Sequence, residues 1–354
     1  MKPYGLFSDP HYHSWSAFGS TLPNGESSRL RTLLNTTLDM AKHLKSSGGS
    51  VLHCGGDMFH TRGQLKPSVL NPVIETFKVI TEMGIKVIVI AGNHDLESKD
   101  SQELTNALGA LKGVGVEVVH DYHLDVESKV VSVAWRNKTS QLMSDIANIA
   151  AKLSFEGVDI GDHDLIIHAP VNGIIMGIPD HGLSGEELSK LPFKRVFSGH
   201  YHNHKWLNDR VCSIGALTHQ NWGDVKSIAG YMLVHDKSVD HHTTSAPKFI
   251  DLDLVDDEEE VVGNYIRAKV EIESDSEIEE IREKMLDAGA AGVIIMPQRK
   301  ASSVTGRTAV SGKIDSMNEA IGGFVEGKFK ERSEEQRKLI FSQAQDVMSR
   351  VDTE

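Results

Sequence analysis

The sequence predicts an α/β fold in which parallel β-strands alternate with helices. Five short apolar runs precede residue 205, and each leads directly into a polar cluster. Between the first three runs, apolar residues recur at helical spacing over 30–44 and 69–80, and these segments stop at Gly48 and Gly84. Such alternation of strand and helix is typical of parallel sheets. Because ligands of such sheets bind outside the carboxyl ends of the strands, the polar clusters should meet in space.

The predicted strands are short and rich in β-branched residues, as strands buried on both faces are. They cover Gly5–Ser8, Val51–Cys54, Val87–Ala91, Leu165–Ile167 and Val196–Ser198. From about residue 130 the pattern becomes rich in strands, with runs at 130–135, 210–214 and 231–235. These later runs predict a second sheet.

The C-terminal part predicts a small α+β module and a helical tail. A strand at 265–273, a helix at 277–288 and a strand at 292–297 follow the acidic run DLDLVDDEEE, which we interpret as a solvated face. The Gly/Ser/Thr-rich segment 301–312 and the pair Gly322-Gly323 predict a flexible tether. Beyond it, apolar residues at helical spacing predict an amphipathic helix over 331–351. Its apolar stripe could pack against its own module or bind a partner protein.

Composition places the chain among ordinary soluble proteins. It has 354 residues, of which 39% are hydrophobic and 25% charged, enough for about two domains. No apolar run approaches the ~20 residues of a membrane helix, and no signal-peptide core is present, so we expect no membrane contact and a cytoplasmic location. Cys54 and Cys212 lie in strand-like runs and are expected in the core. The net charge is −13, so any binding of nucleic acid must depend on local features of the chain or on a partner protein.

The polar clusters contain oxygen and imidazole ligands and no thiolate, a donor set that suits Mn²⁺, Fe²⁺ or Zn²⁺ in catalytic sites. The predicted ligands are Asp9, His11, Asp57, Asn93, His168, His200 and His202. Seven ligands are too many for one open ion but suit two, and Asp57, after the middle strand of the first three, is the natural bridge. Two divalent ions and two aspartates leave a charge of about +2, which would attract a phosphate and lower the pKa of a bridging water. The predicted chemistry is metal-assisted hydrolysis of a phosphoester.

Two further histidines need not be ligands. His94 follows Asn93 and could reach the leaving-group oxygen as a general acid. His60 could contact the phosphate, or it could only orient a ligand. Asp95 is expected to cap or orient His94. A lone Asp-x-His or His-x-His is common by chance, but the ordered set at five strand ends is specific for a functional site.

Five short motifs carry these residues: DPH (9–11), GGDMFH (55–60), GNHD (92–95), the histidine of HAPVNG (168) and GHYH (199–202). Together they resemble the phosphoesterase motifs of calcineurin-like metallophosphoesterases. Within that superfamily the sequence is most similar to SbcD-type DNA repair nucleases, including the shorter nuclease subunits of phage recombination complexes, because of the GD-x-F-H form and the KPS at 66–68. Tyr12 and His13 depart from the usual Leu-Gly after the first motif, so the loop 13–28 should shape the DNA entrance differently.

The resemblance implies a metallophosphoesterase fold of two facing mixed β-sheets flanked by helices, with a small α+β capping domain and a C-terminal helix. The implied domains are a nuclease domain at 1–254, a capping domain at 255–298, and a linker with a partner-binding helical segment at 299–354. His94 would be the catalytic histidine and His60 its phosphate-side helper. One Mn²⁺ ion would be held by Asp9, His11, Asp57 and His202, and the other by Asp57, Asn93, His168 and His200.

The primary interpretation is a Mn²⁺-dependent DNA nuclease of repair and recombination, with double-strand exonuclease and single-strand endonuclease activity, that works with an SbcC-type coiled-coil ATPase. Two alternatives stay open: a stand-alone phosphodiesterase that acts on small nucleotides, and a non-catalytic scaffold with a phosphoesterase fold. The scaffold is disfavoured because it needs neither seven ligands nor His94. The sequence leaves the oligomeric state open, a homodimer included.

Overall fold

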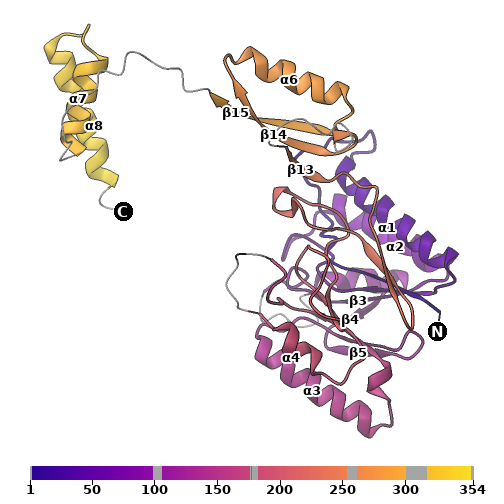
Figure 1. The fold of residues 1–354 in the computed structure, drawn as a ribbon. Helices are drawn as coiled ribbons and strands as arrows, with labels where there is room; N and C mark the ends of the chain where they lie inside the picture. Colours follow the sequence, from indigo (N-terminus) through magenta and orange to yellow (C-terminus); the bar gives the residue numbers. More distant parts are fainter. Residues whose placement is uncertain are drawn as a thin grey trace. The chain divides into compact units, whose positions relative to one another are not determined.

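The computed structural model describes residues 2–98, 106–175, 177, 182–252, 261–299 and 317–351. The chain divides into two units, Met1–Gln298 and Arg299–Glu354. The first unit confirms the predicted α/β fold, because it contains two large mixed sheets flanked by helices (Figure 1). In the described part of the chain, no helix is long and apolar enough to cross a membrane.

The first sheet is built on the strand and helix alternation at the N-terminus. Its order is β12 (Val239–His242), β11 (Tyr231–Val234), β1 (Tyr4–Phe7), β2 (Val51–Cys54), β3 (Lys86–Ile90) and β4 (Glu117–Val119). β1 to β4 are parallel to one another. The helices α1 (Ser28–Ser46) and α2 (Pro67–Glu82) pack against this sheet and bury Leu30, Leu34 and Phe77 completely.

One strand assignment is wrong. The run at 231–235, which the sequence pattern places in the second sheet, forms β11 in the first sheet and pairs antiparallel with β1. All four residues of β11 are buried, and β12 then covers its outer edge. Pairing on this side satisfies the backbone groups of β1, which would otherwise lie on an open sheet edge. A local apolar pattern predicts a strand but not the sheet that the strand joins.

The second sheet faces the first across a shared core. Its order is β5 (Tyr122–Asp125), β6 (Val130–Val133), β7 (Asp164–His168), β8 (Val196–Gly199), β10 (Val211–Ser213) and β9 (Lys205–Trp206). Ile166 and Phe197 belong to the same buried cluster as Leu52 of the first sheet. Their neighbours Leu165 and Ile167 instead pack with α3 (Thr139–Phe155). This alternation explains why β7 is apolar on both faces.

A third, smaller sheet is called the capping sheet here. It consists of β13 (Phe249–Leu252), β14 (Tyr265–Ile272) and β15 (Gly292–Arg299), and α6 (Ser276–Asp287) packs against it through the buried Met285. The predicted order of strand, helix and strand is confirmed for β14, α6 and β15. β13 comes before residue 255, where the capping domain is predicted to begin, and pairs with β14. Most of the acidic run, 253–260, and the tether segment 301–312 lie outside the described residues.

The remaining elements are short or belong to the second unit. The described part of the first unit also contains α4 (Gly185–Ser189) and the 3₁₀ helices η2 (Ala107–Val114), η3 (Ile160–Asp162) and η4 (Trp222–Asp224). The second unit contains α7 (Met317–Lys328) and α8 (Glu334–Val351), the latter at the predicted tail helix. The assignment of Gly322-Gly323 to a tether is wrong, because both lie in α7. A Cβ atom at Gly322 would lie 3.6 Å from Phe341, so close helix packing outweighs the low helix propensity of glycine here.

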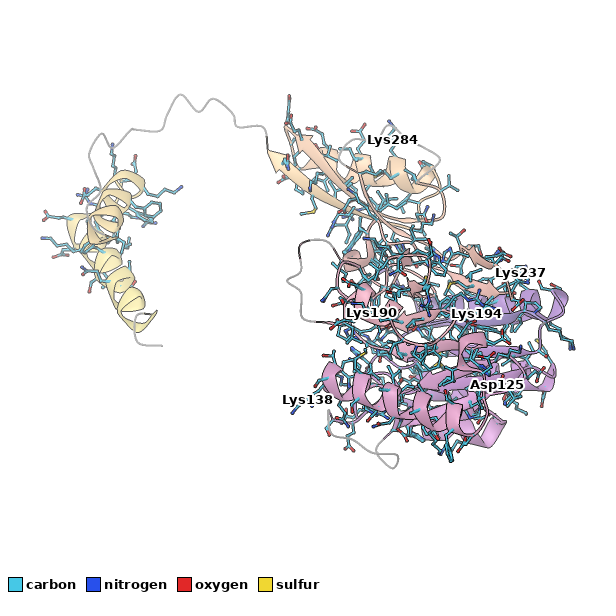
Figure 2. The ribbon with its side chains drawn as sticks, turned by 60° about the horizontal axis from the view of Figure 1, so that its bottom comes forward. Asp125, Lys138, Lys190, Lys194, Lys237 and Lys284 are labelled. Carbon is cyan, nitrogen blue, oxygen red and sulfur yellow. The ribbon has the colours of Figure 1, made fainter. Side chains whose placement is uncertain are left out.

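Several lysines lie at the surface, whereas both cysteines lie in the core. Lys138, Lys190 and Lys237 are exposed, and Figure 2 shows Lys138 at the edge of the first unit. Cys54 and Cys212 are both free and buried, in agreement with their predicted place in the core.

His53, on β2, is a fully buried histidine away from the polar clusters. Its Nε2 atom forms a hydrogen bond of 2.9 Å with the hydroxyl of Ser128. Burial lowers the pKa of His53 to about 3, although the nearby Asp125 carboxylate opposes this shift. The folded protein therefore holds this imidazole neutral, whereas the unfolded chain protonates it below its usual pKa of about 6.5.

We predict that His53→Gln, which keeps a polar group toward Ser128, reduces the acid sensitivity of the fold. The pKa of His53 is lower in the folded state than in the unfolded chain. The free energy of unfolding is therefore at its full value above pH 6.5 and decreases as the pH falls, because only the unfolded chain binds the proton. Between pH 7 and pH 5 the wild type should lose about 2 kcal/mol more of its free energy of unfolding than the variant. Urea unfolding at pH 7, 6 and 5 measures the difference, and equal pH slopes would contradict the assignment.

Candidate metal centre

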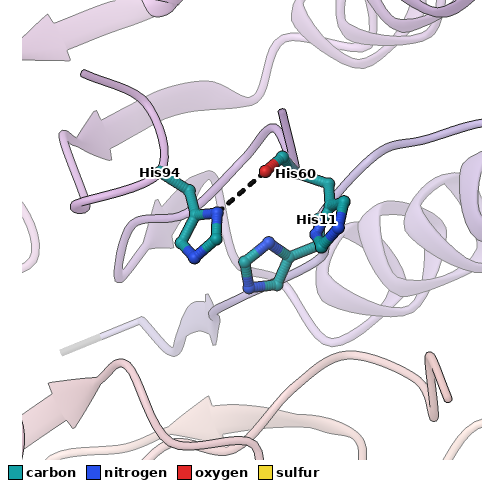
Figure 3. A group of neighbouring side chains, drawn as sticks. All are labelled: His11, His60 and His94. Atoms are coloured by element: carbon teal, nitrogen blue, oxygen red, sulfur yellow. Dashed lines mark hydrogen bonds between the residues drawn. The ribbon is translucent and has the colours of Figure 1, made fainter. Parts of the chain in front are cut away.

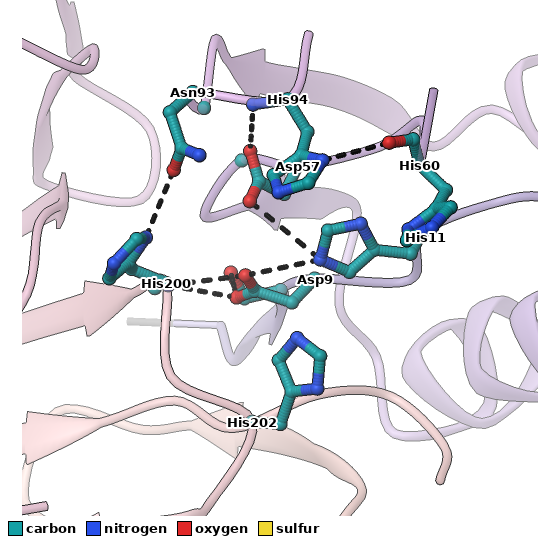
Figure 4. Close-up of polar contacts among 12 residues, drawn as sticks. Asp9, His11, Asp57, His60, Asn93, His94, His200 and His202 are labelled. Carbon is teal, nitrogen blue, oxygen red and sulfur yellow. Dashed lines mark hydrogen bonds and ion pairs between the residues drawn. The ribbon is translucent and has the colours of Figure 1, made fainter. Parts of the chain in front are cut away.

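The carboxyl ends of five strands converge on one place, as the strand pattern predicts. The structure brings all nine predicted site residues together there, and Figure 4 shows most of them. β1, β2 and β3 come from the first sheet, whereas β7 and β8 come from the second. The nine residues are Asp9, His11, Asp57, His60, Asn93, His94, His168, His200 and His202.

Two groups of side chains in this cluster are suited to hold a metal ion. In the first, ligand atoms of Asp9, His11 and His202 all lie within 4.8 Å of one another. The second consists of Asp57, His168 and His200 at the same spacing. Asp9 and His11 are buried, with exposed fractions of 0% and 3%, so these polar groups need partners inside the protein.

Asp57 lies between the two groups. Its Oδ2 atom is 3.7 Å from Nε2 of His11 in the first group and 3.3 Å from Nε2 of His168 in the second. Asn93 adjoins the second group, since its Oδ1 atom lies 3.1 Å from Nε2 of His168 and 2.9 Å from Nδ1 of His200. The position of Asp57 therefore suits a carboxylate shared by two ions.

The remaining imidazole contacts fit metal ligation. Nδ1 of His168 donates to the carbonyl of Gly55 at 2.7 Å, and Nδ1 of His202 donates to Asp224 at 2.7 Å. Such contacts fix the ring and leave Nε2 free to face an ion, as in most histidine metal ligands. Nδ1 of His11 is buried and has no hydrogen-bond partner in the described structure. Oxygen and imidazole donors with this second layer of contacts fit two divalent ions.

The backbone at this place is in a rare conformation. Asp9, His11, Asp57 and His200 have positive φ angles of 49°, 43°, 53° and 104°. Residues other than glycine seldom adopt this left-handed region, and such strain gathers at functional sites. Gly56, with φ 105°, is required as a glycine because a Cβ atom there would lie 2.5 Å from the ring of His168.

Electrostatic balance keeps the central carboxylate charged. Burial by itself would raise the pKa of Asp57, but His168 and His11 outweigh it and hold that pKa well below its usual range. Burial opposes protonation of His168, yet the charge of Asp57 raises its pKa to about 9. By contrast, burial lowers the pKa of His200 to about 3, with His168 acting in the same direction. Asp57 is thus ionised at neutral pH.

The two predicted catalytic histidines lie beside the first group. Nδ1 of His94 donates to the carbonyl of His60 at 2.8 Å (Figure 3), so its Nε2 atom is left for a substrate. The rings of His60 and His94 are stacked with centroids 5.7 Å apart. Burial lowers the pKa of His60 to about 4, and the next cause is His13. The nitrogens of His11, His60 and His94 also lie within 4.8 Å of one another.

Asp95 has a different role from the expected one. Its carboxylate accepts the backbone N–H groups of Gly92 at 2.9 Å and Phe59 at 3.1 Å, so it ties the loops after β2 and β3 together. The ring of His94 is oriented by the carbonyl of His60 instead. Sequence reasoning also missed Asp224, the partner of His202, because no motif or spacing marks this carboxylate at the end of η4.

We predict that Asp57→Asn, which removes the charge but keeps the shape, disrupts both ion sites. Neither group keeps its full set of anionic ligands without this carboxylate, so retained Mn²⁺ should fall from two equivalents to one or none and phosphoester hydrolysis by at least about 100-fold. Elemental analysis after dialysis measures the metal, with exposed Asp209→Asn as the control. A variant that keeps two equivalents would show that Asp57 is not the bridge.

Solved structures with some similarity include proteins from three organisms. A Thermus thermophilus protein has a TM-score of 0.43 and 11% identity, covering 68% of this chain and 98% of its own. A dimetal phosphatase from Danio rerio has a TM-score of 0.42 and 11% identity, covering 65% of this chain and 91% of its own. For the nuclease MPE of Pseudomonas putida the TM-score is 0.29 and the identity 16%, with coverages of 68% and 91%. No curated protein matches the chain.

The family assignment comes from the sequence profile of calcineurin-like phosphoesterases, which matches residues 2–204. This region contains all nine predicted site residues and more than half of the 354-residue chain. The family hydrolyses phosphoester bonds with two metal ions. The chain therefore belongs to the calcineurin-like phosphoesterase family.

Proposed function

We propose that this protein is a Mn²⁺-dependent DNA nuclease of repair and recombination that works with an SbcC-type coiled-coil ATPase. The observation that carries the proposal is the position of Asp57 between two ligand groups, with His94 next to them. The motif resemblance to SbcD-type nucleases supports DNA as the substrate. A stand-alone phosphodiesterase on small nucleotides remains the alternative to test.

The residues of the proposed centre have different roles in phosphoester hydrolysis. When bound, two divalent ions would supply positive charge for the phosphate and lower the pKa of the attacking water. Asp9, His11 and His202 would hold one ion, and Asn93, His168 and His200 the other, with Asp57 shared. His94 would donate a proton from Nε2 to the departing 3′ oxygen, because its Nδ1–H is already committed to the carbonyl of His60.

A pocket beside the candidate metal-binding side chains supports a nucleotide-sized substrate. It has a volume of about 510 Å³, within the usual range for small-ligand sites. The metal-ligand candidates His200 and His202 line it, together with the apolar side chain of Ile175 and the exposed Lys226. An apolar wall suits a base, and a lysine suits an adjacent phosphate.

The helical pair in the second unit supports a protein partner. The ion pair between Arg337 and Glu326, at 2.7 Å, joins α8 to α7, and Val325 is only 3% exposed. On α8, the apolar residues Ile340 and Ala344 are half-buried. Phe324 and Leu339 remain 61% and 60% exposed, and large apolar side chains at the surface of a helical pair are typical of docking surfaces for other helices.

The substrate test compares two esters with the purified protein and Mn²⁺. We expect hydrolysis of linear double-stranded DNA and of bis-nitrophenyl phosphate. Hydrolysis of the small ester alone would favour the stand-alone phosphodiesterase, and hydrolysis of neither would favour the non-catalytic scaffold.

The His94→Gln variant extends that experiment. It should keep both ions, because His94 belongs to neither ligand group of the proposed centre, but should cleave DNA about 10²- to 10⁴-fold more slowly. The nitrophenyl ester should be affected much less, since its leaving group needs little protonation. Equal losses on both substrates would mean that His94 positions the phosphate and is not the acid.

The partner proposal predicts that Phe324→Ser combined with Leu339→Ser weakens binding to a co-expressed SbcC-type ATPase by at least tenfold, an effect expected for loss of two apolar anchors. Hydrolysis of the small ester should stay unchanged. Phe155→Ser, at a 94% exposed phenylalanine of α3, is the matched control. Unchanged binding of the double variant in a pull-down would remove the helical pair from the proposal.

A further inference from the structure

A buried arginine lies between the capping sheet and the loop that supports the metal ligands. Arg29, the second residue of α1, is only 6% exposed. Its guanidinium donates to the carbonyl of Gln220 at 2.8 Å and to the carbonyl of Ala17 at 3.2 Å. No carboxylate of the described chain lies within 4.0 Å of it, so these carbonyls and the hydroxyl of Tyr265 are its hydrogen-bond partners, without an ion pair.

Aromatic rings complete the surroundings of Arg29. The centroids of Phe249 on β13 and Tyr265 on β14 lie 5.1 and 5.3 Å from the guanidinium carbon, and that of Trp15 lies 5.7 Å away. Phe18 stacks on Tyr265 with centroids 4.7 Å apart. A desolvated arginine above several ring faces is attracted to each of them. Arg29 therefore joins two strands of the capping sheet to α1.

Gln220 extends this connection to the first ligand group. Its side-chain amide donates to the backbone carbonyl of Asp9 at 2.6 Å. Its backbone N–H donates to Asp224 at 2.7 Å, and the other oxygen of Asp224 accepts from His202 at 2.7 Å. One residue held by Arg29 thus contacts both Asp9 and the partner of His202.

We propose that Arg29 is a positioning residue that makes the first ligand group depend on the capping sheet. The inference rests on the proposed two-metal centre and adds a residue that touches neither ion nor substrate. Arg29 fixes the carbonyl of Gln220. Through Gln220 it holds the backbone of Asp9 in its left-handed conformation and keeps Asp224 in hydrogen-bond contact with His202.

The second ligand group contacts Asp9 through the backbone N–H of His200, which donates to the Asp9 carboxylate at 3.0 Å, but it also has supports of its own. Asp57, His168 and His200 lie at or just after the ends of β2, β7 and β8, and His168 is anchored by the carbonyl of Gly55. Loss of Arg29 should therefore weaken the first ion site far more than the second. A general loss of stability would instead weaken both.

The experiment is a Mn²⁺ titration of Arg29→Met, followed by electron paramagnetic resonance of the free ion. The wild type should bind two equivalents. In the variant, one equivalent should bind at least about tenfold more weakly, as is usual when a group behind a metal ligand is removed, and the other should change less than about twofold. Arg29→Lys, which keeps a cation above the rings, should restore at least part of the affinity.

Two further variants make the result decisive. Gln220→Leu leaves Arg29 in place but removes the hydrogen bond to the carbonyl of Asp9, so it should cause the same selective loss of Mn²⁺ affinity. If Arg29→Met does not fold, this variant tests the positioning role instead. Arg195→Met is the matched control: Arg195 is 8% exposed, pairs with Asp164 at 2.7 Å and precedes β8 at the end opposite His200, so both equivalents should remain.

Three results would overturn the positioning role: equal weakening of both equivalents, no weakening in either Arg29→Met or Gln220→Leu, or the same selective loss in Arg195→Met. A wild type that binds fewer than two equivalents would instead refute the two-metal centre on which the inference rests.

Discussion

The carboxylate of Asp57 is buried, and a buried charge is tolerated only with partners of opposite charge or strong hydrogen-bond donors. Here these partners come from other segments: the rings of His11 and His168, and the backbone N–H of His94 at 2.8 Å. The two sheets must face each other for these segments to meet. The fold therefore has to assemble before this charge is balanced, and divalent ions would balance it further.

Much of this arrangement could be predicted because it follows from a local rule. Each ligand segment comes at the end of a buried strand, and strand ends of parallel sheets share one edge. The rule holds even though the strands divide between two sheets, since the ends of β7 and β8 face those of β1 and β2. The prediction that Asp9 and His168 lie close together therefore does not depend on their separation in the sequence.

Features that depend on long-range packing could not be predicted. The apolar pattern of β11 is the same whichever sheet it joins, and only the open edge of β1 decides the outcome. Gly322 has a low helix propensity, which packing against Phe341 outweighs. Asp224 and Gln220 act on the metal ligands through the folded backbone. The loop 13–28, expected to shape the entrance, sends Trp15 toward His60 and Phe18 toward the capping sheet.

The central claim is that two ions share Asp57. Anomalous diffraction from crystals grown with Mn²⁺ tests it most directly. The account predicts two peaks, one among Asp9, His11 and His202 and one among His168, His200 and Asn93, with a carboxylate oxygen of Asp57 in contact with each. A single peak, or a peak held by His11, His60 and His94, would contradict it.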